Sequence, residues 1–197
     1  MIKYIVFDLA EVIISGYAGV ETILGEMLNL PSDVVDKHLF DENFLELMRG
    51  KNTENEYFKE LSDRTNWDIS VNDLKEICRK NFENEVPGVK EVILELKKKY
   101  KLVLLSDHVK EWIEYILNTN DFLDIFDEKY FSYEFGSIKS EGKIFKEVLE
   151  NLGVNSEEIL FIDDSEKNVE VAKNLNIDAI VFKDVEQLVK ELEYRNI

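Results

Sequence analysis

The sequence predicts an α/β fold, in which a doubly wound, parallel, five-stranded sheet carries an inserted α-helical segment. Short apolar runs without alternation recur along the chain, as expected of strands that are buried on both faces. Helical patterns separate the later runs, which is typical of parallel strands joined by crossover helices. Residues 16–85 show helical patterns and no strong strand signal, which predicts the insertion.

Four of the five predicted strands are rich in Val, Ile, Leu and Phe. The strands cover residues 2–7, 101–106, 129–133, 158–163 and 178–182. The third run, KYFSY, is more polar than the others. We therefore predict that it lies at an edge of the sheet.

Two helices are predicted between the last three strands. The stretch GKIFKEVLENLG has its apolar residues on one helical face and ends at Gly153. The stretch EKNVEVAKNLN has the same periodicity and ends near Asn176. Glycine and asparagine both tolerate the left-handed conformation that closes many helices, so both helices have a predicted end.

Residues 16–85 are predicted to form an inserted helical cap domain, and residues 1–15 and 86–197 the α/β core domain. Pro31 suits a first helical turn, and TENE at 53–56 is a capping box. Pro87-Gly88 marks the return to the core domain. Inserts of this kind commonly act as lids that exclude water from an active site. The alternative is a helical appendage that only stabilises the fold.

Composition restricts the class of partner and the location of the protein. The formal net charge of −18 at pH 7 argues against nucleic-acid or membrane-surface binding, because both require a basic face. No apolar stretch approaches the roughly 18 residues of a membrane helix, and the N-terminus lacks the features of a signal peptide. Cys78, the single cysteine, has an apolar helical position and is predicted to be a buried thiol. Since one cysteine forms no intramolecular disulfide, the sequence predicts a reducing, cytoplasmic location.

Acidic residues end two of the apolar strands. Asp8 follows the first run, and Asp163 and Asp164 end the fourth. Ligands of open parallel sheets bind at this edge. If the two strands are neighbours, three carboxylates share one crevice and need a cation to stay ionised together. Carboxylate oxygens are ligands that Mg²⁺ prefers, so the sequence predicts a magnesium site.

Four motifs, in order along the chain, resemble those of the haloacid dehalogenase (HAD) superfamily of phosphohydrolases. They are DLAEV from Asp8, LVLLS ending at Ser106, GSIKSE with Lys139, and FIDDSEKN at 161–168. The helical insert lies between the first two motifs, in the position of that superfamily's helical cap. The first motif is most similar to a sugar-phosphatase-like branch, which has a non-acidic residue two positions after the nucleophile.

The resemblance implies a Mg²⁺-dependent phosphatase with a HAD-like sheet, acting on a small phosphorylated metabolite such as a sugar phosphate. Asp8 would attack phosphorus to form an aspartyl-phosphate. Ser106 would donate its hydroxyl to a phosphoryl oxygen, and Lys139 would neutralise phosphoryl charge.

The resemblance also implies a set of metal ligands. Asp8, the backbone carbonyl of Ala10 and the carboxylate of Asp164 would bind Mg²⁺. Asp163 would lie next to the metal, either in direct contact or through water. Asn168 would support this group.

Ala10 departs from the superfamily's pattern, in which this position usually holds a second aspartate that acts as general acid and base. Loss of such a group typically costs ~10²–10⁴ in rate. Three outcomes follow: the leaving group needs little protonation, Glu11 or His108 transfers the proton, or the chain binds phosphorylated ligands without turnover. Asp107 stands where an asparagine is often found and adds negative charge near the phosphate site.

Two alternatives to an active phosphatase come from Ala10. The first is a catalytically weak or inactive protein that binds a phosphorylated ligand or a protein partner. The second is a hydrolytic dehalogenase, which needs no metal and would leave the acidic cluster without a role. Substrate selection would belong to the insert, with Tyr17, Phe44, Met48 and Arg49 as candidates. The sequence is compatible with both a monomer and a homodimer.

Overall fold

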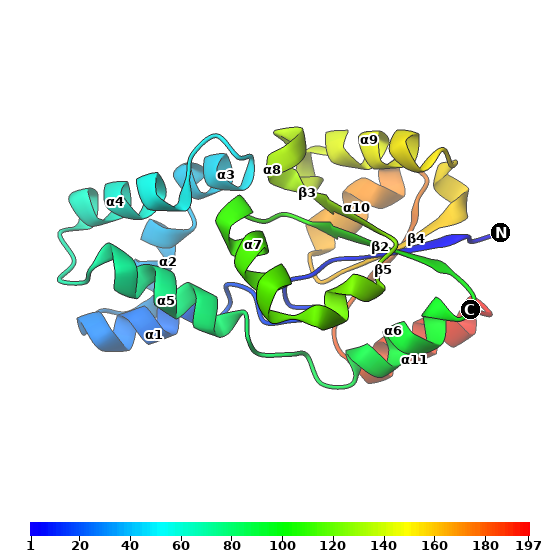
Figure 1. The fold of residues 1–197 in the computed structure, drawn as a ribbon, viewed down its shortest axis with the longest axis horizontal. Helices are drawn as coiled ribbons and strands as arrows, with labels where there is room; N and C mark the ends of the chain where they lie inside the picture. The colour runs from blue at the N-terminus through cyan, green and yellow to red at the C-terminus, as the bar shows by residue number, and fades with distance from the viewer.

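The computed structural model describes residues 1–197 and contains one sheet of five parallel strands in the order β3-β2-β1-β4-β5 (Figure 1). The strands are β1 (Tyr4–Phe7), β2 (Lys101–Ser106), β3 (Glu128–Phe131), β4 (Ile159–Asp163) and β5 (Asp178–Val181). The predicted α/β sheet is confirmed, and the polar third strand lies at an edge. β1 is central, so its carboxyl end has a neighbour on each side.

The third strand is shorter at its end than predicted. It was expected over 129–133 but ends at Phe131, because Ser132 begins the short helix α8 (Ser132–Phe135). Glu134 accepts a hydrogen bond from the Phe131 amide at 3.2 Å, and the Ser132 hydroxyl donates to the Met48 carbonyl at 2.6 Å. These side-chain bonds draw the chain away from the sheet.

Ten further helices and three short 3₁₀ turns complete the fold. The first five helices are α1 (Val20–Leu28), α2 (Ser32–Leu39), α3 (Glu42–Met48), α4 (Glu54–Thr65) and α5 (Val71–Asn81). The others are α6 (Val89–Lys97), α7 (Lys110–Thr119), α9 (Lys143–Leu152), α10 (Glu166–Asn174) and α11 (Val185–Tyr194). The turns are η1 (Asp121–Ile125), η2 (Lys139–Glu141) and η3 (Ser156–Glu158). The predicted left-handed residues are present, at Gly153 with φ 65° and Asn176 with φ 59°.

Helices cover both faces of the sheet (Figure 1). On one face, α9 and α10 pack on strand residues such as Val6, Leu105 and Phe161. On the other face, α6, α7 and α11 pack on residues such as Phe7 and Leu104. Because successive strand residues face opposite layers and both layers are apolar, the strands are apolar without alternation.

Helices α1 to α5 come between β1 and α6 in the sequence. In space they extend beyond the sheet (Figure 1). The two connections to them run side by side, because Ile14 and Glu85 form an antiparallel bridge. The last two of these helices show the predicted features: Thr53 forms a capping box on α4, and Ser70 caps α5. Apolar packing continues from these helices into α7. That residues 16–85 form a separate domain stays a prediction.

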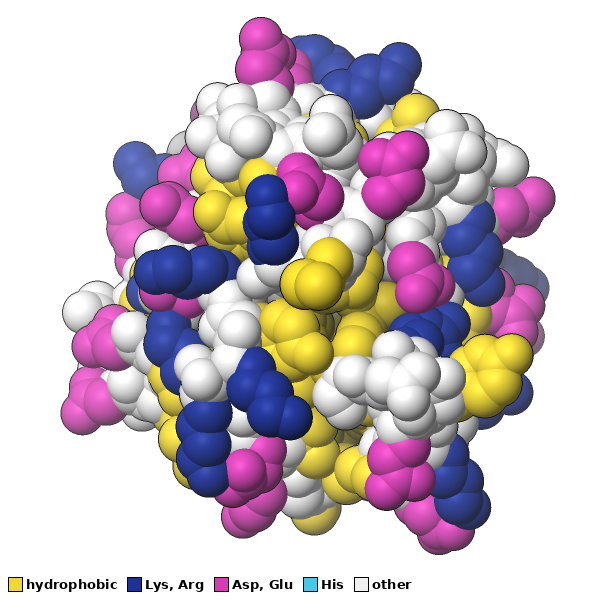
Figure 2. Space-filling model, turned by 90° about the vertical axis from the view of Figure 1, so that its right-hand side faces the viewer, with side chains coloured by type: hydrophobic (Ala, Val, Ile, Leu, Met, Phe, Trp, Pro, Cys, Tyr) yellow, Lys and Arg dark blue, Asp and Glu magenta, His cyan; other side chains and the backbone are white.

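None of the helices combines the length and the apolar character that crossing a membrane requires. Figure 2 shows the end of the molecule that carries both termini, where basic and acidic side chains intermingle around apolar ones. Cys78 is buried, as predicted.

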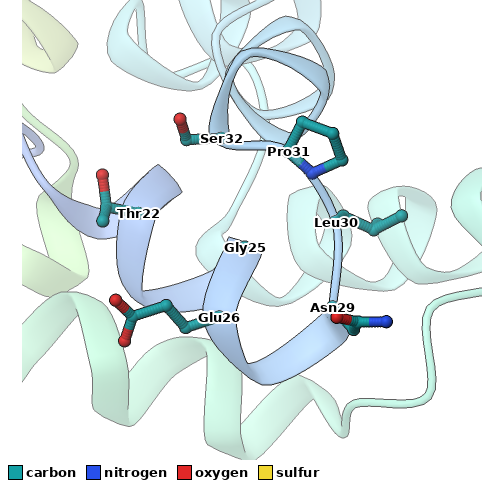
Figure 3. Close-up of a pocket in the computed structure, with 7 residues that line it drawn as sticks. All are labelled: Thr22, Gly25, Glu26, Asn29, Leu30, Pro31 and Ser32. Carbon is teal, nitrogen blue, oxygen red and sulfur yellow. The ribbon is translucent and has the colours of Figure 1, made fainter.

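A hollow of about 490 Å³ lies where α1 turns into α2 (Figure 3). Its lining is Thr22, Gly25, Glu26, Asn29, Leu30, Pro31 and Ser32. Gly25 lies close to the returning chain, since a Cβ atom there would be 2.8 Å from the Leu30 carbonyl oxygen. This turn therefore depends on the missing side chain.

We expect Gly25→Ala to lower the free energy of unfolding by about 1–2 kcal/mol. Alanine is the better helix former by about 1 kcal/mol, but the Leu30 carbonyl is backbone and has no side-chain rotation with which to avoid the new Cβ. Urea unfolding measures the change. Glu26→Ala, an exposed position on the same helix, is the control and should stay within about 0.5 kcal/mol of wild type. A Gly25→Ala chain as stable as wild type would contradict the expectation.

Candidate active site

The carboxyl ends of three neighbouring strands bring the predicted residues together. Asp8 follows β1, Ser106 ends β2, and Asp163 ends β4. The Asp8 amide donates to the Ile162 carbonyl at 2.9 Å, so the hydrogen bonding between β1 and β4 extends as far as Asp8. The predicted proximity of the two acidic strand ends is confirmed.

Lys139 lies inside this group, with its side chain 1% exposed. Its Nζ atom is 2.7 Å from Asp8 Oδ1 and 2.6 Å from Asp163 Oδ2. Burial alone would lower the pKa of Lys139, but the negative charges of Asp163, Asp8 and Asp107 outweigh it and raise the pKa. The lysine is therefore a fixed positive charge at neutral pH.

Asp163 is held by several donors besides Lys139. Its Oδ1 atom accepts hydrogen bonds from the Ser165 amide at 2.8 Å and from Asn168 Nδ2 at 3.2 Å. Ser165 also caps α10, because its hydroxyl accepts a bond from the Asn168 amide at 3.4 Å. Both Asp163 oxygens are thus used by the chain, and one of their donors is Asn168.

Asp8 and Ser106 keep free hydrogen-bonding capacity. Asp8 Oδ1 accepts from the Leu9 amide at 2.7 Å and contacts Lys139, whereas no protein group donates to Oδ2. The Ser106 hydroxyl is buried and has no partner in the chain. Leaving a buried hydroxyl unpaired costs about 1–3 kcal/mol, so this group is suited to a ligand.

The acidic residues fit a hard divalent cation. Carboxylate oxygens of Asp8, Asp163 and Asp164 lie within 4.8 Å of one another. Burial, opposed by Lys139 and reinforced by Asp163, raises the pKa of Asp8 well above its usual value. Partial burial and Asp163 likewise raise the pKa of Asp164. One lysine therefore leaves excess negative charge, and oxygen donors are the ligands that Mg²⁺ prefers.

The Ala10 backbone carbonyl is free to accept a further contact. No amide of the chain donates to the Ala10 carbonyl, although the neighbouring Leu9 and Glu11 take part in backbone bonds with Ile13 and Ile14. The alanine side chain carries no acid or base.

The Glu11 carboxylate is used within its own loop. Glu11 has a left-handed backbone with φ 57°, and its Oε1 atom accepts from the Gly16 amide at 2.7 Å and the Ala18 amide at 3.3 Å. Glu11 was considered as a replacement for the missing acid. Its position supports a role in closing the loop between residues 11 and 18.

His108 was the other residue considered for proton transfer, and its ring is completely buried. The ring lies 5.2 Å from Phe82, 5.6 Å from Tyr17 and 5.9 Å from Trp112, measured between centroids. Nδ1 accepts from the Val109 amide at 3.1 Å, which assigns the proton to Nε2. Burial and the charge of Lys139 lower the pKa of His108 to about 3. A ring that is neutral at pH 7 is a poor general acid.

Asp107 has a role that sequence reasoning did not find. Both of its carboxylate oxygens accept from the Lys139 backbone amide, at 3.0 and 3.1 Å. Burial, opposed by the charge of Lys139, raises the pKa of Asp107 to about 6. The aspartate therefore holds the turn that delivers Lys139.

The four candidates for substrate selection have partners within the chain. The Tyr17 and Phe44 rings are 5.1 Å apart, and the Tyr17 hydroxyl is 3.4 Å from His108 Nδ1. Met48 is buried. Arg49 forms ion pairs with three glutamates, among them Glu141.

Comparisons with known proteins give a consistent result. A family model described as haloacid dehalogenase-like hydrolase matches residues 2–176. D-ribitol-5-phosphate phosphatase from Bacteroides thetaiotaomicron is 31% identical over 187 residues, which cover 90% of each chain.

Two solved structures are similar over nearly their full length. One is a HAD family enzyme from Bacteroides thetaiotaomicron in complex with magnesium and inorganic phosphate, with a TM-score of 0.77, 26% identity, and coverage of 94% of this chain and 96% of that chain. The other is a predicted HAD-like family hydrolase from Porphyromonas gingivalis, with a TM-score of 0.78, 26% identity, and coverage of 99% and 98%.

The raised pKa of Asp107 makes a prediction about stability. In the folded chain Asp107 keeps its proton up to a pH of about 6, whereas the ordinary pKa of an aspartate is 3.8. As pH rises from 3.8 to 6, ionisation of Asp107 therefore lowers the free energy of unfolding of the wild type. Asp107→Asn lacks this loss. We expect the unfolding free energy of the variant, relative to wild type, to increase by about 2–3 kcal/mol from pH 4 to pH 7.

Urea unfolding at both pH values measures this difference. Asp127→Asn is the control: despite partial burial, hydrogen bonds from Lys97 and Leu102 lower the pKa of Asp127 to about 2, outside the range tested. Its difference from wild type should stay constant between pH 4 and pH 7. A constant difference for Asp107→Asn as well would show that Asp107 ionises normally.

Proposed function

Because this chain belongs to the haloacid dehalogenase-like hydrolases and is an enzyme of their phosphatase type, we propose that it hydrolyses a small phosphorylated sugar or sugar alcohol with Mg²⁺ and an aspartyl-phosphate on Asp8. One observation carries the proposal: buried Lys139 lies between Asp8 and Asp163, at the same sheet edge as the unpartnered Ser106 hydroxyl.

Asp8 is the proposed nucleophile. Its Oδ1 atom is held by the Leu9 amide and Lys139, which leaves Oδ2 to form the bond to phosphorus. As that bond forms, the bond from phosphorus to the ester oxygen breaks and the leaving oxygen takes a proton from water. A second water then attacks phosphorus as the bond from phosphorus to Asp8 Oδ2 breaks, which releases inorganic phosphate and restores the Asp8 carboxylate. The proton that this water loses neutralises the hydroxide left when the leaving oxygen was protonated.

Lys139 and Ser106 are proposed to stabilise the phosphoryl group. Transfer of a phosphoryl group depends mainly on positioning and on stabilisation of negative charge. Lys139 supplies a fixed positive charge beside Asp8, and the Ser106 hydroxyl supplies a donor that has no competing partner. Both groups are in place before the substrate binds, so little reorganisation is needed.

Asp8, the Ala10 carbonyl and Asp164 are the proposed Mg²⁺ ligands. When bound, Mg²⁺ would offset the negative charge of the phosphoryl group and of the carboxylates. Asp163 is proposed to act indirectly, because its oxygens already accept from Lys139, Ser165 and Asn168. It would orient the lysine next to the metal.

The helices α1 to α5 are proposed to form a cap over this site. Asp8 is 5% exposed and Ser106 is fully buried, so a substrate reaches phosphoryl-transfer distance only after the site opens, and these helices are the proposed moving part. Closure would then exclude bulk water from the site during phosphoryl transfer and retain the water that protonates the leaving oxygen.

The proposed substrate class rests on the relative that acts on D-ribitol 5-phosphate. A metabolite of this kind combines one phosphate, for the Lys139 end of the site, with hydroxyl groups. The aromatic rings around Tyr17 lie at the boundary between the helices and the sheet. They would exclude water around the carbon chain of the substrate.

Asp8→Asn should abolish hydrolysis of p-nitrophenyl phosphate, with a loss of more than about 10³-fold in kcat, because the amide does not form the phosphoryl ester. The wild type should require Mg²⁺ and lose turnover with a chelator. Asp33→Asn, an exposed acid on α2, is the control and should keep wild-type rates. Circular dichroism checks that each variant is folded. Wild-type turnover in Asp8→Asn would exclude this nucleophile.

Ala10 favours a second candidate, a protein that binds phosphorylated ligands or a protein partner with little or no turnover. Neither Glu11 nor His108 is free to supply the missing proton. The Glu11 carboxylate is hydrogen-bonded within its own loop, and the His108 ring is neutral and buried. The cluster of Asp8, Lys139 and Asp164 would still bind a metal and a phosphate.

Restoring the acid distinguishes the two candidates. We expect Ala10→Asp to raise kcat on an alkyl phosphate by about 10²-fold and to change turnover of p-nitrophenyl phosphate little, since nitrophenolate leaves without protonation. The ratio of the two rates is the measurement. Ala10→Ser, which adds a polar side chain without an acid, is the control. An equal change on both substrates would mean that the new carboxylate does not protonate the leaving group.

A further inference from the structure

The Glu141 carboxylate joins α3 to the turn that carries Lys139. Its Oε1 atom accepts from Arg49 Nε at 2.9 Å and from Arg49 Nη2 at 2.6 Å. Its Oε2 atom accepts from the Ser137 hydroxyl at 2.8 Å and from the Ile138 amide at 3.3 Å. One oxygen thus faces the helices α1 to α5, and the other faces its own turn.

This turn is held from three directions. Asp107 binds the Lys139 amide, and Asp8 and Asp163 bind its ammonium group. The third contact is Arg49 through Glu141, and it alone among the three comes from the helical segment. The position of the Lys139 turn therefore depends on whether the helical segment is seated, that is, packed so that Arg49 contacts Glu141.

The adjoining residue supports the same contact surface. The Ser132 hydroxyl donates to the Met48 carbonyl at 2.6 Å and accepts from the His108 amide at 3.0 Å. The end of α3 is therefore fixed against the sheet edge at Met48 and against the lysine turn at Arg49.

The ion pair between Arg49 and Glu141 can break without leaving Arg49 unpaired. Its Nη1 atom also pairs with Glu42 at 2.9 Å and with Glu46 at 2.7 Å, both on α3. If α3 moves away, the arginine keeps these two partners, so no buried charge is left alone. Glu141 is 38% exposed on its side chain, and ion pairs with such exposure are individually weak.

We propose that Arg49 is a positioning residue that couples seating of the helical segment to the placement of Lys139. In the seated state, Arg49 fixes Glu141, and Glu141 fixes Ser137 and Ile138 immediately before the lysine. With the segment lifted, the turn loses its link to α3. The inference rests on the proposed function, because it assigns a purpose to opening and closing over Asp8.

The test is a double-mutant cycle on p-nitrophenyl phosphate hydrolysis with Mg²⁺, using Arg49→Gln, Glu141→Gln and the double variant. Each single change should lower kcat about fivefold and leave KM nearly unchanged. The double variant should be no slower than the slower single variant, because both changes remove one link. Arg195→Gln is the matched control, since Arg195 pairs with Asp178 and Glu191 far from the turn.

Two kinetic results would overturn the inference. If Arg49 contacts the substrate directly, Arg49→Gln raises KM, and its effect multiplies with that of Glu141→Gln in the double variant. If the ion pair between Arg49 and Glu141 does not affect the placement of Lys139, kcat of both single variants equals that of the control.

A second measurement needs no turnover. Trp112 is 1% exposed and its Nε1 donates to Glu54 Oε1 at 2.6 Å, so it reports on seating of the helices. In a Trp67→Phe background, Arg49→Gln should increase acrylamide quenching of Trp112 fluorescence. Unchanged quenching contradicts the link. If the wild type hydrolyses no phosphate ester, the proposed function fails, and quenching alone decides the inference.

Discussion

The buried ion pairs of Lys139 with Asp8 and Asp163 are the constraint on which the rest of the structure depends. Removing these charges from water is costly, and breaking one buried pair typically costs about 3–5 kcal/mol because a charge is left alone. The pairs form only if β1 and β4 are neighbours and the lysine turn is held above them. Asp107 holds the turn and Asn168 holds Asp163, so several polar residues serve one arrangement of charge.

The helical segment meets the sheet and its flanking helices through apolar packing, hydrogen bonds such as that of Ser132 to Met48, and an ion pair. Around Trp112, rings from both sides pack together, and the neutral His108 is part of that packing. Apolar packing of this kind excludes water but has little directional preference. At Arg49 the contact is ionic and depends on orientation. The apolar packing excludes water from the boundary, and the ion pair depends on the orientation of the segment.

Local pattern was enough to predict the strands, the ends of the two helices that close at Gly153 and Asn176, and the residues at the strand ends. Asp8, Ser106 and Asp163 converge because strand ends of a parallel sheet meet at one edge, whatever the details of packing. The roles of Asp107 and Glu141 depend on side-chain directions across distant segments, which periodicity does not encode. The burial of His108 was not encoded by periodicity either, because the residue lies in the loop between β2 and α7, two residues before the helix begins.

The position of β1 in the middle of the sheet has a consequence for biosynthesis. Tyr4 pairs with Lys101 on one side and with Ile159 on the other, so both partners of this strand leave the ribosome long after it does. Helices α1 to α5 are synthesised in between and can form contacts with residues nearby in the sequence. During this time both edges of the apolar β1 remain unpaired. The strand that leads to Asp8 is thus the one most dependent on protection from aggregation, and the candidate active site is assembled only when β4 has emerged.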